Sequence, residues 1–422
     1  MMILTYPKTD TTTEPALADL EITASGTEWL RKLSAVGVVN TARPAVPILG
    51  FVLLECSRGN ATVTSYDYVT SAVVKLKHEA VGPLRNSKAI APFSWLVRTI
   101  RVLTNRKRDV LVTVASRLLL GRPMITVTAA GYTIPLVHAA PVSEFPSIPE
   151  HAEVDSLALD REELAGALDR VWIAASKDDT LPILTAIQLE CSGKALTFRA
   201  TDRYRLATET VHLPRAVQEF TFLLRAAAWK SMAKHLTGDK ISLRVLVTAD
   251  HARRPGGSYT LSLSSGDAAF TLTGIEGDYP KIGTLFADSY ERTLEVNRRD
   301  LLDQVLVAKE LTEPRQPSRI TMTSESVTVA PTLHEGSEAL ATPQLAAVTT
   351  GDGHWQDPAG LGLNPHYLLE ALRSTTAEAI KFSFNELHKP ICITPVQGKD
   401  DKPSSYRHLI MPVRIPSTLG GE

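Results

Sequence analysis

Basic residues gather on two predicted helices that contain no acidic residue. The first helix, with its tail, runs from Pro92 to Arg108 and carries Arg98, Arg101, Arg106, Lys107 and Arg108. The second runs from Leu224 to Leu236 and carries Arg225, Lys230 and Lys234. Spacings of three and four residues, as in 98/101 and 230/234, place cations on one face of a helix. Such a face can contact the phosphates of a nucleic acid without reading its sequence.

The chain as a whole is not basic. It has 45 Lys and Arg against 46 Asp and Glu, which gives a net charge of -1. Any attraction to phosphate must therefore come from local segregation of charge. The alternative interpretation of the two helices is an ordinary solvated face, and the repeat and motifs in the rest of the chain disfavour it.

The best candidate for catalytic chemistry is the segment from Gly351 to Asp357, in which His354 and two aspartates could bind a metal ion. A solvated loop is the favoured interpretation, because the sequence has no phosphate-binding glycine loop, HExxH pair, nucleophile elbow or paired-cysteine spacing. Cys56, Cys191 and Cys392 are far apart and odd in number, which is typical of core residues in a reducing compartment. We expect a non-enzymatic protein without metal or cofactor.

Length and composition indicate a globular protein of several domains. The 422 residues exceed one ordinary core and favour two or three domains. With 44% hydrophobic and 22% charged residues, the chain has no apolar run of the roughly 18 residues that a membrane span needs. Residues 1–20 lack the basic and apolar blocks of a signal peptide. We expect a cytoplasmic, nucleoid-associated protein with no membrane contact.

An internal repeat organises the chain. The run from Pro47 to Ser57 (PILGFVLLECS) recurs 135 residues later from Pro182 to Ser192 (PILTAIQLECS). The same offset carries Asp67 onto Asp202 without a gap. Both copies are rich in apolar and branched residues and continue through a turn into alternating residues, so each predicts a β-hairpin. Repeats of this kind are the sequence signature of repeated structural units.

Helical spacing precedes each hairpin and predicts a helix before it. A third helix-then-hairpin pattern begins at Asn297. A second helix then follows in each unit: Pro92 to Leu103, Leu224 to Leu236, and Pro365 to Leu372 with Asn364 as its cap. These patterns predict a flexible extension over residues 1–19 and three domains over residues 20–152, 153–290 and 291–422.

Three motifs carry a resemblance to a known family. They are Asp178 to Thr185 (DDTLPILT), Ala200 to Ala207 (ATDRYRLA) and Tyr406 to Ile415 (YRHLIMPVRI). Together, in this order and at these separations, they resemble the bacterial DNA polymerase III beta subunits, or beta sliding clamps. The resemblance covers nearly the whole chain after about residue 20.

The resemblance implies an α+β fold, the DNA-clamp fold. Three similar domains would each place two helices toward a pore and two antiparallel sheets outside, and two chains would join head to tail into a ring, because three modules per chain give six in a dimer. Such a protein is expected to encircle double-stranded DNA and confer processivity. Its partners would be a second copy of itself and, through peptide motifs, polymerase subunits, the clamp loader and repair proteins.

Two surfaces follow from the resemblance. It places Arg43 and Lys177 near the pore, so the expected DNA-binding set is Arg43, Arg98, Arg101, Arg106, Lys177, Lys230 and Lys234. A peptide groove between the second and third domains, called the peptide groove below, is carried over as Leu184, Thr201, Arg203, Tyr204, Arg205, Leu206, Pro280, Leu285, Leu409, Met411, Pro412, Val413 and Arg414. Apolar residues would form its pocket, with Arg and Tyr at its rim. The alternative is that these segments are merely a core strand and a turn.

Some features depart from the family pattern. Arg203 stands where some clamps have glycine, and residues 332–358 have little family character. The N-terminal extension and the nearly balanced charge are further departures, while the Thr201 to Arg205 motif looks actinobacterial. An alternative function is therefore that of a paralogous or phage-encoded clamp, including one that gives resistance to a clamp-binding antibiotic.

Overall fold

The structure, a computed structural model, describes residues 20–40, 44–57, 59–81, 86–105, 110–119, 122–136, 140–248, 259–313, 316–333, 339, 341–351, 361–386, 388–398, 404–413 and 415. The chain divides into two compact units. Unit 1 comprises Met1–His151, Lys234–Gly238 and Ser262–Thr273, and unit 2 comprises Ala152–Ala233, Asp239–Leu261 and Gly274–Glu422. Among the described residues, no helix has both the length and the apolar character to span a bilayer.

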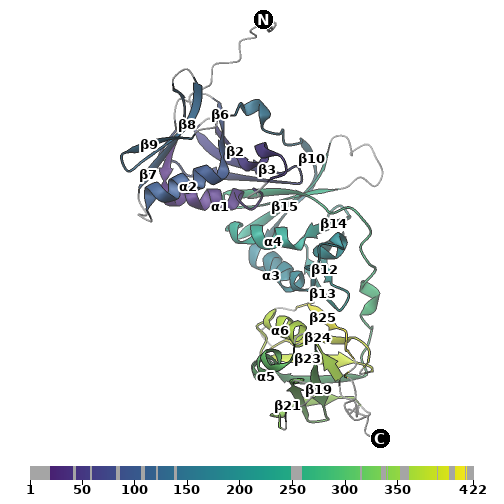
Figure 1. Cartoon of the computed structure of the whole chain (residues 1–422). Coiled ribbons are helices and arrows are strands. Elements are labelled where there is room, and N and C mark those ends of the chain that lie inside the picture. The colour runs from purple at the N-terminus through teal and green to yellow at the C-terminus, as the bar shows by residue number, and fades with distance from the viewer. Residues whose placement is uncertain are drawn as a thin grey trace, which may run out of the picture. The chain divides into compact units, whose positions relative to one another are not determined.

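In its described residues, unit 1 contains two α-helices and two groups of antiparallel strands (Figure 1). Its elements are β1 (Glu21–Ser25), α1 (Gly26–Val36), η1 (Pro47–Gly50), β2 (Phe51–Ser57), β3 (Asn60–Tyr66), β4 (Thr70–Leu76), β5 (Ala80–Val81), β6 (Ser87–Pro92), α2 (Phe93–Thr104), β7 (Leu111–Leu119), β8 (Arg122–Ala129), β9 (Tyr132–Leu136), η2 (Val142–Glu144) and β17 (Ala268–Thr273). One sheet has the order β5-β1-β7-β8-β9, and the other strands run in the order β17-β4-β3-β2-β6. Helices α1 and α2 pack against each other, with the indole of Trp29 fully buried.

Unit 2 contains four helices, counted over its described residues. Its elements are β10 (His151–Asp160), α3 (Arg161–Val171), η3 (Trp172–Ala174), η4 (Pro182–Thr185), β11 (Ala186–Ser192), β12 (Ala195–Thr201), β13 (Arg205–His212), β14 (Phe220–Arg225), α4 (Ala226–Met232), β15 (Lys240–Thr248), η6 (Gly283–Leu285), β18 (Arg292–Asn297), α5 (Arg298–Leu311), β19 (Ser318–Met322), β20 (Ser326–Ala330), β21 (Leu345–Thr350), β22 (Leu361–Leu363), α6 (Pro365–Arg373), β23 (Ala379–Phe384), β24 (Ile391–Val396) and β25 (Arg407–Ile410). The chain passes between the units within β10, η5 (Ala233–His235) and β16 (Thr260–Ser265), and again after Gly238 and Thr273.

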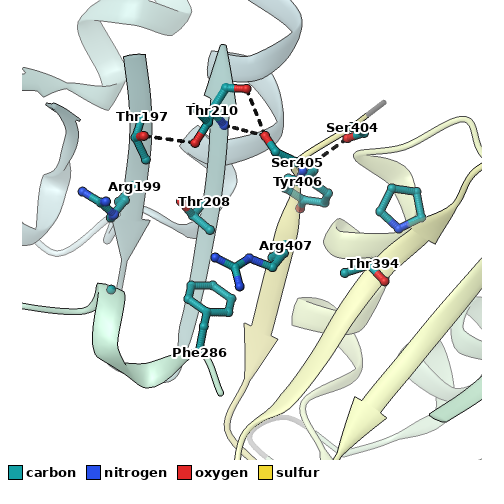
Figure 2. A pocket seen from close by; sticks show the side chains of 12 residues that line it. Thr197, Arg199, Thr208, Thr210, Phe286, Thr394, Ser404, Ser405, Tyr406 and Arg407 are labelled. Carbon is teal, nitrogen blue, oxygen red and sulfur yellow. Dashed lines mark hydrogen bonds between the residues drawn. The ribbon is translucent and has the colours of Figure 1, made fainter. Parts of the chain in front are cut away.

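One twelve-stranded sheet runs through unit 2. Its order is β14-β11-β12-β13-β25-β24-β23-β18-β21-β20-β19-β22. The junction between its two halves is the antiparallel pair β13 and β25, in which Leu206 lies opposite Leu409 and Thr208 opposite Arg407. Beyond the strand end, the hydroxyl of Ser405 accepts a hydrogen bond from the backbone N–H of Thr210 at 2.7 Å (Figure 2). Segments about 200 residues apart in the sequence are thus joined by backbone hydrogen bonds.

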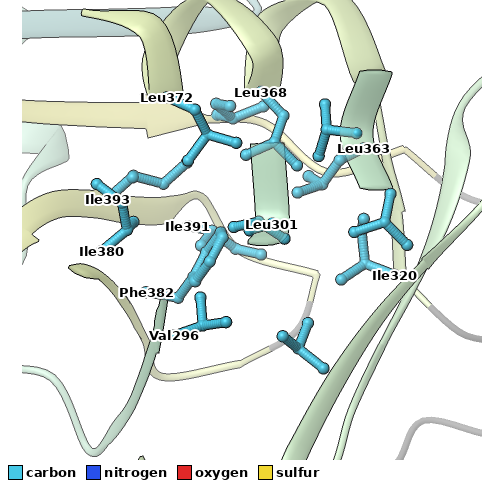
Figure 3. Close-up of a cluster of buried hydrophobic side chains, with 14 of the residues drawn as sticks. Val296, Leu301, Ile320, Leu363, Leu368, Leu372, Ile380, Phe382, Ile391 and Ile393 are labelled. Atoms are coloured by element: carbon cyan, nitrogen blue, oxygen red, sulfur yellow. The ribbon is translucent and has the colours of Figure 1, made fainter. Parts of the chain in front are cut away.

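The second half of this sheet has its own apolar core (Figure 3). Leu301 from α5, Leu368 and Leu372 from α6, and Phe382 from β23 are each at most 1% exposed. These side chains come from both helices and from the strands beneath them, and α5 packs against α6. Burial of a large apolar side chain stabilises a fold by roughly 1.5–3 kcal/mol, so this cluster fixes the helices on the sheet.

Helix starts follow the predicted repeat. Ser25 caps α1 by accepting from the N–H of Glu28 at 3.2 Å, and Asp160, 135 residues later, caps α3 by accepting from the N–H of Glu163 at 3.0 Å. The predicted cap Asn364 accepts from the N–H of His366 at 2.9 Å, with proline at the first helical position. A capping side chain pairs a backbone N–H that would otherwise have no partner in the helix.

Two local predictions need correction. The helix predicted over Leu224 to Leu236 begins only at Ala226, because Leu224 and Arg225 end strand β14. Helix α4 ends at Met232 and continues as the 3-10 turn η5, a tightening common at helix ends. The runs that begin at Pro47 and Pro182 start as 3-10 turns and become strands only at Phe51 and Ala186, because proline cannot donate to a strand ladder. The division into three domains stays a prediction.

Candidate DNA-binding helices and peptide groove

Helix α2 presents its cations to solvent. Arg98 and Arg101 are exposed, whereas Leu96 and Ile100 on the opposite side are fully buried. The apolar residues fix the orientation of the helix, so the predicted cationic face is the exposed one. Trp95, 47% exposed, lies one helical turn before Arg98 and adds an aromatic surface to this face.

Three predicted DNA-binding lysines are exposed in separate elements. Lys230 extends from α4, and its ammonium lies 4.7 Å from the ring centroid of Trp172. Lys234 is in η5, and Lys177 lies in the loop before η4 with its ammonium 3.9 Å from Glu370. The two remaining predicted DNA contacts, Arg43 and Arg106, lie outside the described residues, as do Lys107 and Arg108.

The turn between β12 and β13 carries two of the predicted groove residues, Arg203 and Tyr204, and other predicted groove residues lie at the adjoining strand ends. The carboxylate of Asp202 accepts hydrogen bonds from the backbone N–H groups of Tyr204 and Arg205, each at 3.0 Å. Asp67 makes the same pair of bonds in unit 1, to Val69 and Thr70. The repeated aspartate therefore has a structural role in both copies, as the acceptor that closes the turn.

Arg203 occupies a backbone conformation that favours glycine. Its φ is 81°, in the left-handed region. The equivalent residue of the first copy, Tyr68, has φ 73°. The hydroxyl of Thr201 supports the turn by accepting from the N–H of Arg203 at 3.1 Å and donating to the carbonyl of Arg205 at 2.7 Å. Where some clamps have glycine, Arg203 therefore adds strain to the backbone of the turn.

Arg205 is buried rather than exposed at a rim. It is 4% exposed, its Nε donates to Asp202 at 3.0 Å, and its guanidinium lies 4.3 Å from the ring centroid of Tyr367. Its Nη1 donates to Glu370 on helix α6. The side chain ties the turn to α6, and a direct contact with a peptide stays a prediction.

The structure brings the turn and the C-terminal strand side by side. The N–H of Met411 donates to the carbonyl of Tyr204 at 2.8 Å, directly beyond the paired residues Leu206 and Leu409. Tyr204 is 57% exposed and Met411 43% exposed, while Leu206 and Leu409 are buried. Met411 and Tyr204 therefore form an exposed apolar surface over a buried pair.

A second segment covers the buried pair. Ile282 and Phe286 pack with Leu206 and Leu409 in one cluster. Tyr279 anchors this segment, because its hydroxyl accepts from the N–H of Thr201 at 3.1 Å, and burial raises the pKa of Tyr279.

The other predicted groove residues differ in exposure. Leu184 is buried in η4, and Pro412 is partly buried. Three are exposed, namely Pro280 beside Tyr279, Leu285 in η6 at 54% and Val413 at 48%, and Arg414 lies outside the described residues.

Comparison with known proteins decides the family. The family model of the DNA polymerase III beta subunit, central domain, matches residues 158–281. A beta sliding clamp of Streptomyces coelicolor is 28% identical over 385 residues, which cover 89% of this chain and 94% of the relative. A beta sliding clamp of Micrococcus luteus is 31% identical over 252 residues, which cover 58% of this chain and 74% of the relative. The chain belongs to the beta sliding clamp family.

The fold of this beta sliding clamp agrees with that assignment. A crystal structure of a sliding clamp from Pseudomonas aeruginosa bound to griselimycin superposes with a TM-score of 0.80 at 19% identity, covering 94% of this chain and 100% of the other. The predicted α+β DNA-clamp fold is confirmed. Membership of the family also confirms the prediction of a protein that is not an enzyme.

The alternative of metal-dependent chemistry stays a prediction. No group of three metal-binding side chains occurs among the described residues. Of the candidate segment 351–357, all but Gly351 lies outside them. Cys56, Cys191 and Cys392 are buried and unpaired, as expected of core residues, and burial raises the pKa of Cys56 to about 11.

Sequence reasoning missed two residues that organise the clamp's site. Glu370 binds Arg205 from 165 positions away, and no local spacing could have indicated that pairing. Trp95 was predictable, because it stands three residues before Arg98 on the same predicted helix and so shares its face. The residues predicted for the two surfaces are thus partly exposed and partly buried.

Proposed function

We propose that this chain is a DNA sliding clamp that encircles duplex DNA as a head-to-tail homodimer and tethers the replicative polymerase and other DNA-processing proteins. The observation that carries the proposal is helix α2 of the clamp fold, whose Arg98 and Arg101 are exposed in a helix without an acidic residue. Family membership supports the processivity role. Its cytoplasmic, nucleoid-associated location stays a prediction.

The chemistry of the basic helices suits sliding. Exposed arginine and lysine side chains attract phosphates wherever the duplex lies, because every base pair presents the same charges. A few such cations hold the duplex weakly and leave no preferred position along it. The closed ring would then keep the protein on the DNA. The cations would determine how the contact between protein and duplex depends on salt concentration.

The peptide groove is proposed as the site where polymerase subunits, the clamp loader and repair proteins bind. Tyr204 and Met411 are exposed neighbours, and Leu285 is an exposed apolar residue on the segment that covers Leu206 and Leu409. An exposed apolar surface rimmed by polar residues is typical of a protein interaction site. Aromatic and methionine side chains suit partners of several sequences.

The test of the DNA-binding proposal is retention on circular DNA after loading. A variant with Arg98, Arg101, Lys230 and Lys234 replaced by Ala should dissociate faster, and the slope of log retention against log salt should flatten, because each lost phosphate contact removes about one released counterion. A control variant with the same change in charge replaces Lys88, Lys194, Lys281 and Lys389, which are exposed in strands and turns. An unchanged slope in the first variant would remove the two helices from the DNA path.

A second candidate function is that of a paralogue that gives resistance to a clamp-binding antibiotic. The observation that favours it is Arg203, a non-glycine residue at φ 81° in the turn beside the peptide groove. Griselimycin, bound in the structure of the Pseudomonas aeruginosa clamp, is a suitable probe. Calorimetry should show weak binding to the wild-type chain and tighter binding to Arg203→Gly, whereas tight binding to both would contradict a resistance role.

A further inference from the structure

A cavity of about 520 Å³ opens on the surface of the twelve-stranded sheet of unit 2. Thr208 from β13, Arg407 from β25 and Thr394 from β24 line it, and Arg199 from β12 reaches it from the neighbouring strand (Figure 2). The ring of Phe286 closes one side. The cavity is therefore built by four adjacent strands and by the segment that covers the buried pair Leu206 and Leu409.

The cavity is cationic. Among the residues that the structure describes, its lining contains Arg199 and Arg407 and no aspartate or glutamate. Arg199 donates to Glu190 and is largely neutralised by it. Arg407 has no carboxylate within ion-pairing distance in the described part of the chain, so it leaves one uncompensated positive charge. The neighbouring Glu209 does not offset it, because alternate residues of β13 face opposite sides, and Glu209 binds Arg170 of α3 on the helix side.

Arg407 is held in place before any ligand arrives. Its guanidinium lies 4.2 Å from the ring centroid of Phe286. Stacking on an aromatic ring restricts the side chain but leaves its N–H donors free at the edges of the guanidinium plane. A guanidinium oriented in this way loses less entropy when it binds a carboxylate or phosphate in bidentate fashion.

Hydroxyl groups add neutral donors around the cation. The hydroxyl of Thr210 is already engaged with that of Thr197 at 3.0 Å. Those of Thr208 and Thr394 have no side-chain partner among the residues the structure places, and both belong to the lining. One arginine with hydroxyls at its side is a donor set for an oxyanion.

The cavity continues the peptide groove along the same strands. The pair Thr208 and Arg407 follows the pair Leu206 and Leu409, two residues farther from Tyr204 and Met411. Residues two apart share a sheet face and are separated by roughly 6.6–6.8 Å. An extended partner chain that crosses the segment of Phe286 needs only a few residues to reach from the apolar surface to Arg407.

We propose that this cavity binds an acidic side chain of a partner protein whose apolar residues occupy the peptide groove, with Arg407 as the principal cation. The inference rests on the proposed groove, and it adds a charge preference to a surface otherwise expected to select apolar side chains. Carboxylate is the favoured anion, since it is the one that a partner segment carries without modification. A phosphorylated residue or free phosphate shares the chemistry and is separated by the test.

The first measurement compares two peptides on the full-length protein. A groove-binding peptide derived from the replicative polymerase is extended at either end by Gly-Gly-Glu-Glu-Glu or by Gly-Gly-Gln-Gln-Gln. One glutamate-extended form should bind roughly two- to fivefold more tightly by fluorescence anisotropy, the upper part of the range for an exposed charge pair. Arg407→Met, which keeps an apolar contact with Phe286, should abolish the difference. The control Arg373→Met removes an exposed arginine from the last turn of α6 and should preserve it.

A second measurement does not depend on the groove. Phenylglyoxal modifies accessible arginines, and peptide mapping by mass spectrometry gives the rate at Arg407. A free tetraglutamate peptide should slow modification of Arg407 and leave Arg373 unchanged.

The outcomes separate the two proposals. If neither extended peptide binds but tetraglutamate protects Arg407, the assignment of the peptide groove is wrong and the proposal of an anion site at Arg407 is supported. Equal affinity of both extended peptides for the wild-type protein overturns the inference. Protection by inorganic phosphate or a phosphoserine peptide, but not by tetraglutamate, would overturn the choice of carboxylate.

Discussion

Arg205 of strand β13 and Glu370 of helix α6 form an ion pair, with Nη1 2.5 Å from Oε2. The arginine is buried and also binds Asp202, so one guanidinium compensates two carboxylates. Asp202 closes the turn that positions Tyr204, and Glu370 belongs to a helix packed on the other half of the sheet. The turn that carries the exposed Tyr204 of the proposed peptide groove is therefore held by a buried charge cluster.

Replacement of Glu370 by Gln should lower the free energy of unfolding by about 1–2 kcal/mol. Glutamine replaces the charge-assisted hydrogen bond between the buried Arg205 and Glu370 by a weaker neutral one. Urea denaturation followed by circular dichroism measures the change. Glu310→Gln, which breaks an exposed pair with Lys309, serves as the control and should show no measurable change. Equal stability of Glu370→Gln and wild type would show that Asp202 alone satisfies Arg205.

Arg203→Gly should raise the free energy of unfolding by about 0.5–1 kcal/mol. A side chain at φ 81° costs about 1–2 kcal/mol that glycine does not incur, and part of this gain is offset by the greater freedom of glycine in the unfolded chain. Arg203→Ala is the matched control, because it removes the same charge and keeps the strained Cβ. Stabilisation by both variants to the same extent would assign the effect to charge rather than to backbone strain.

The parts that were predictable from sequence are those with local causes. The duplicated Asp67 and Asp202 indicated equivalent positions, and both close the same kind of turn, because a side-chain acceptor needs only the next few N–H groups. Arg205 was predicted as a rim residue, yet it is buried, since its partner Glu370 is 165 positions away and only the assembled sheet brings them together. The cavity at Arg407 was missed for the same reason.

Stability should fall as the pH decreases from 7 toward 5, with His408 as one cause. Burial, together with the charge of Arg205, lowers the pKa of His408 to about 3. The unfolded chain binds a proton near pH 6.5 while the folded chain does not, so protonation favours unfolding below that pH. His408→Gln retains an acceptor for the hydroxyl of Tyr406, 2.9 Å away, and should reduce the loss of stability between pH 7 and 5 by up to about 2 kcal/mol.

The control for this prediction is His388→Gln. His388 lies at the surface with its side chain 73% exposed, so its replacement makes the same change of residue type without altering a buried site. Denaturant midpoints at several pH values give the comparison. A pH dependence unchanged in His408→Gln would mean that His408 is protonated in the folded protein.

Dimer formation should depend on exposed apolar residues of helix α5. Val307 and Leu311 are 57% and 55% exposed and stand four residues apart, so they share one face, whereas Leu301 and Val305 are buried. Light scattering should give twice the chain mass of 45.9 kDa for the wild type and 45.9 kDa for Val307→Asp with Leu311→Asp. Val154→Asp changes a similarly exposed valine on β10 and should remain dimeric. A dimer that survives the double substitution would place the interface elsewhere.

Binding of polymerase-derived peptides should depend on Tyr204 and Met411 without altering the dimer. Both side chains are exposed, and only their backbones bond to each other, so truncation to Ala removes apolar surface and leaves the β13 and β25 pairing intact. Each substitution should weaken binding by about 2 kcal/mol, the scale of an interface hot spot.

Calorimetry and light scattering on the same samples separate this effect from misfolding or dissociation. Tyr132→Ala, which truncates a 62% exposed tyrosine in unit 1, is the matched control and should bind normally. Leu409 is unsuitable as a probe, because it is 3% exposed and its truncation would leave a cavity under the strand. If the double variant Tyr204→Ala with Met411→Ala remains dimeric and binds the peptides with wild-type affinity, the partner site lies outside the junction of β13 and β25.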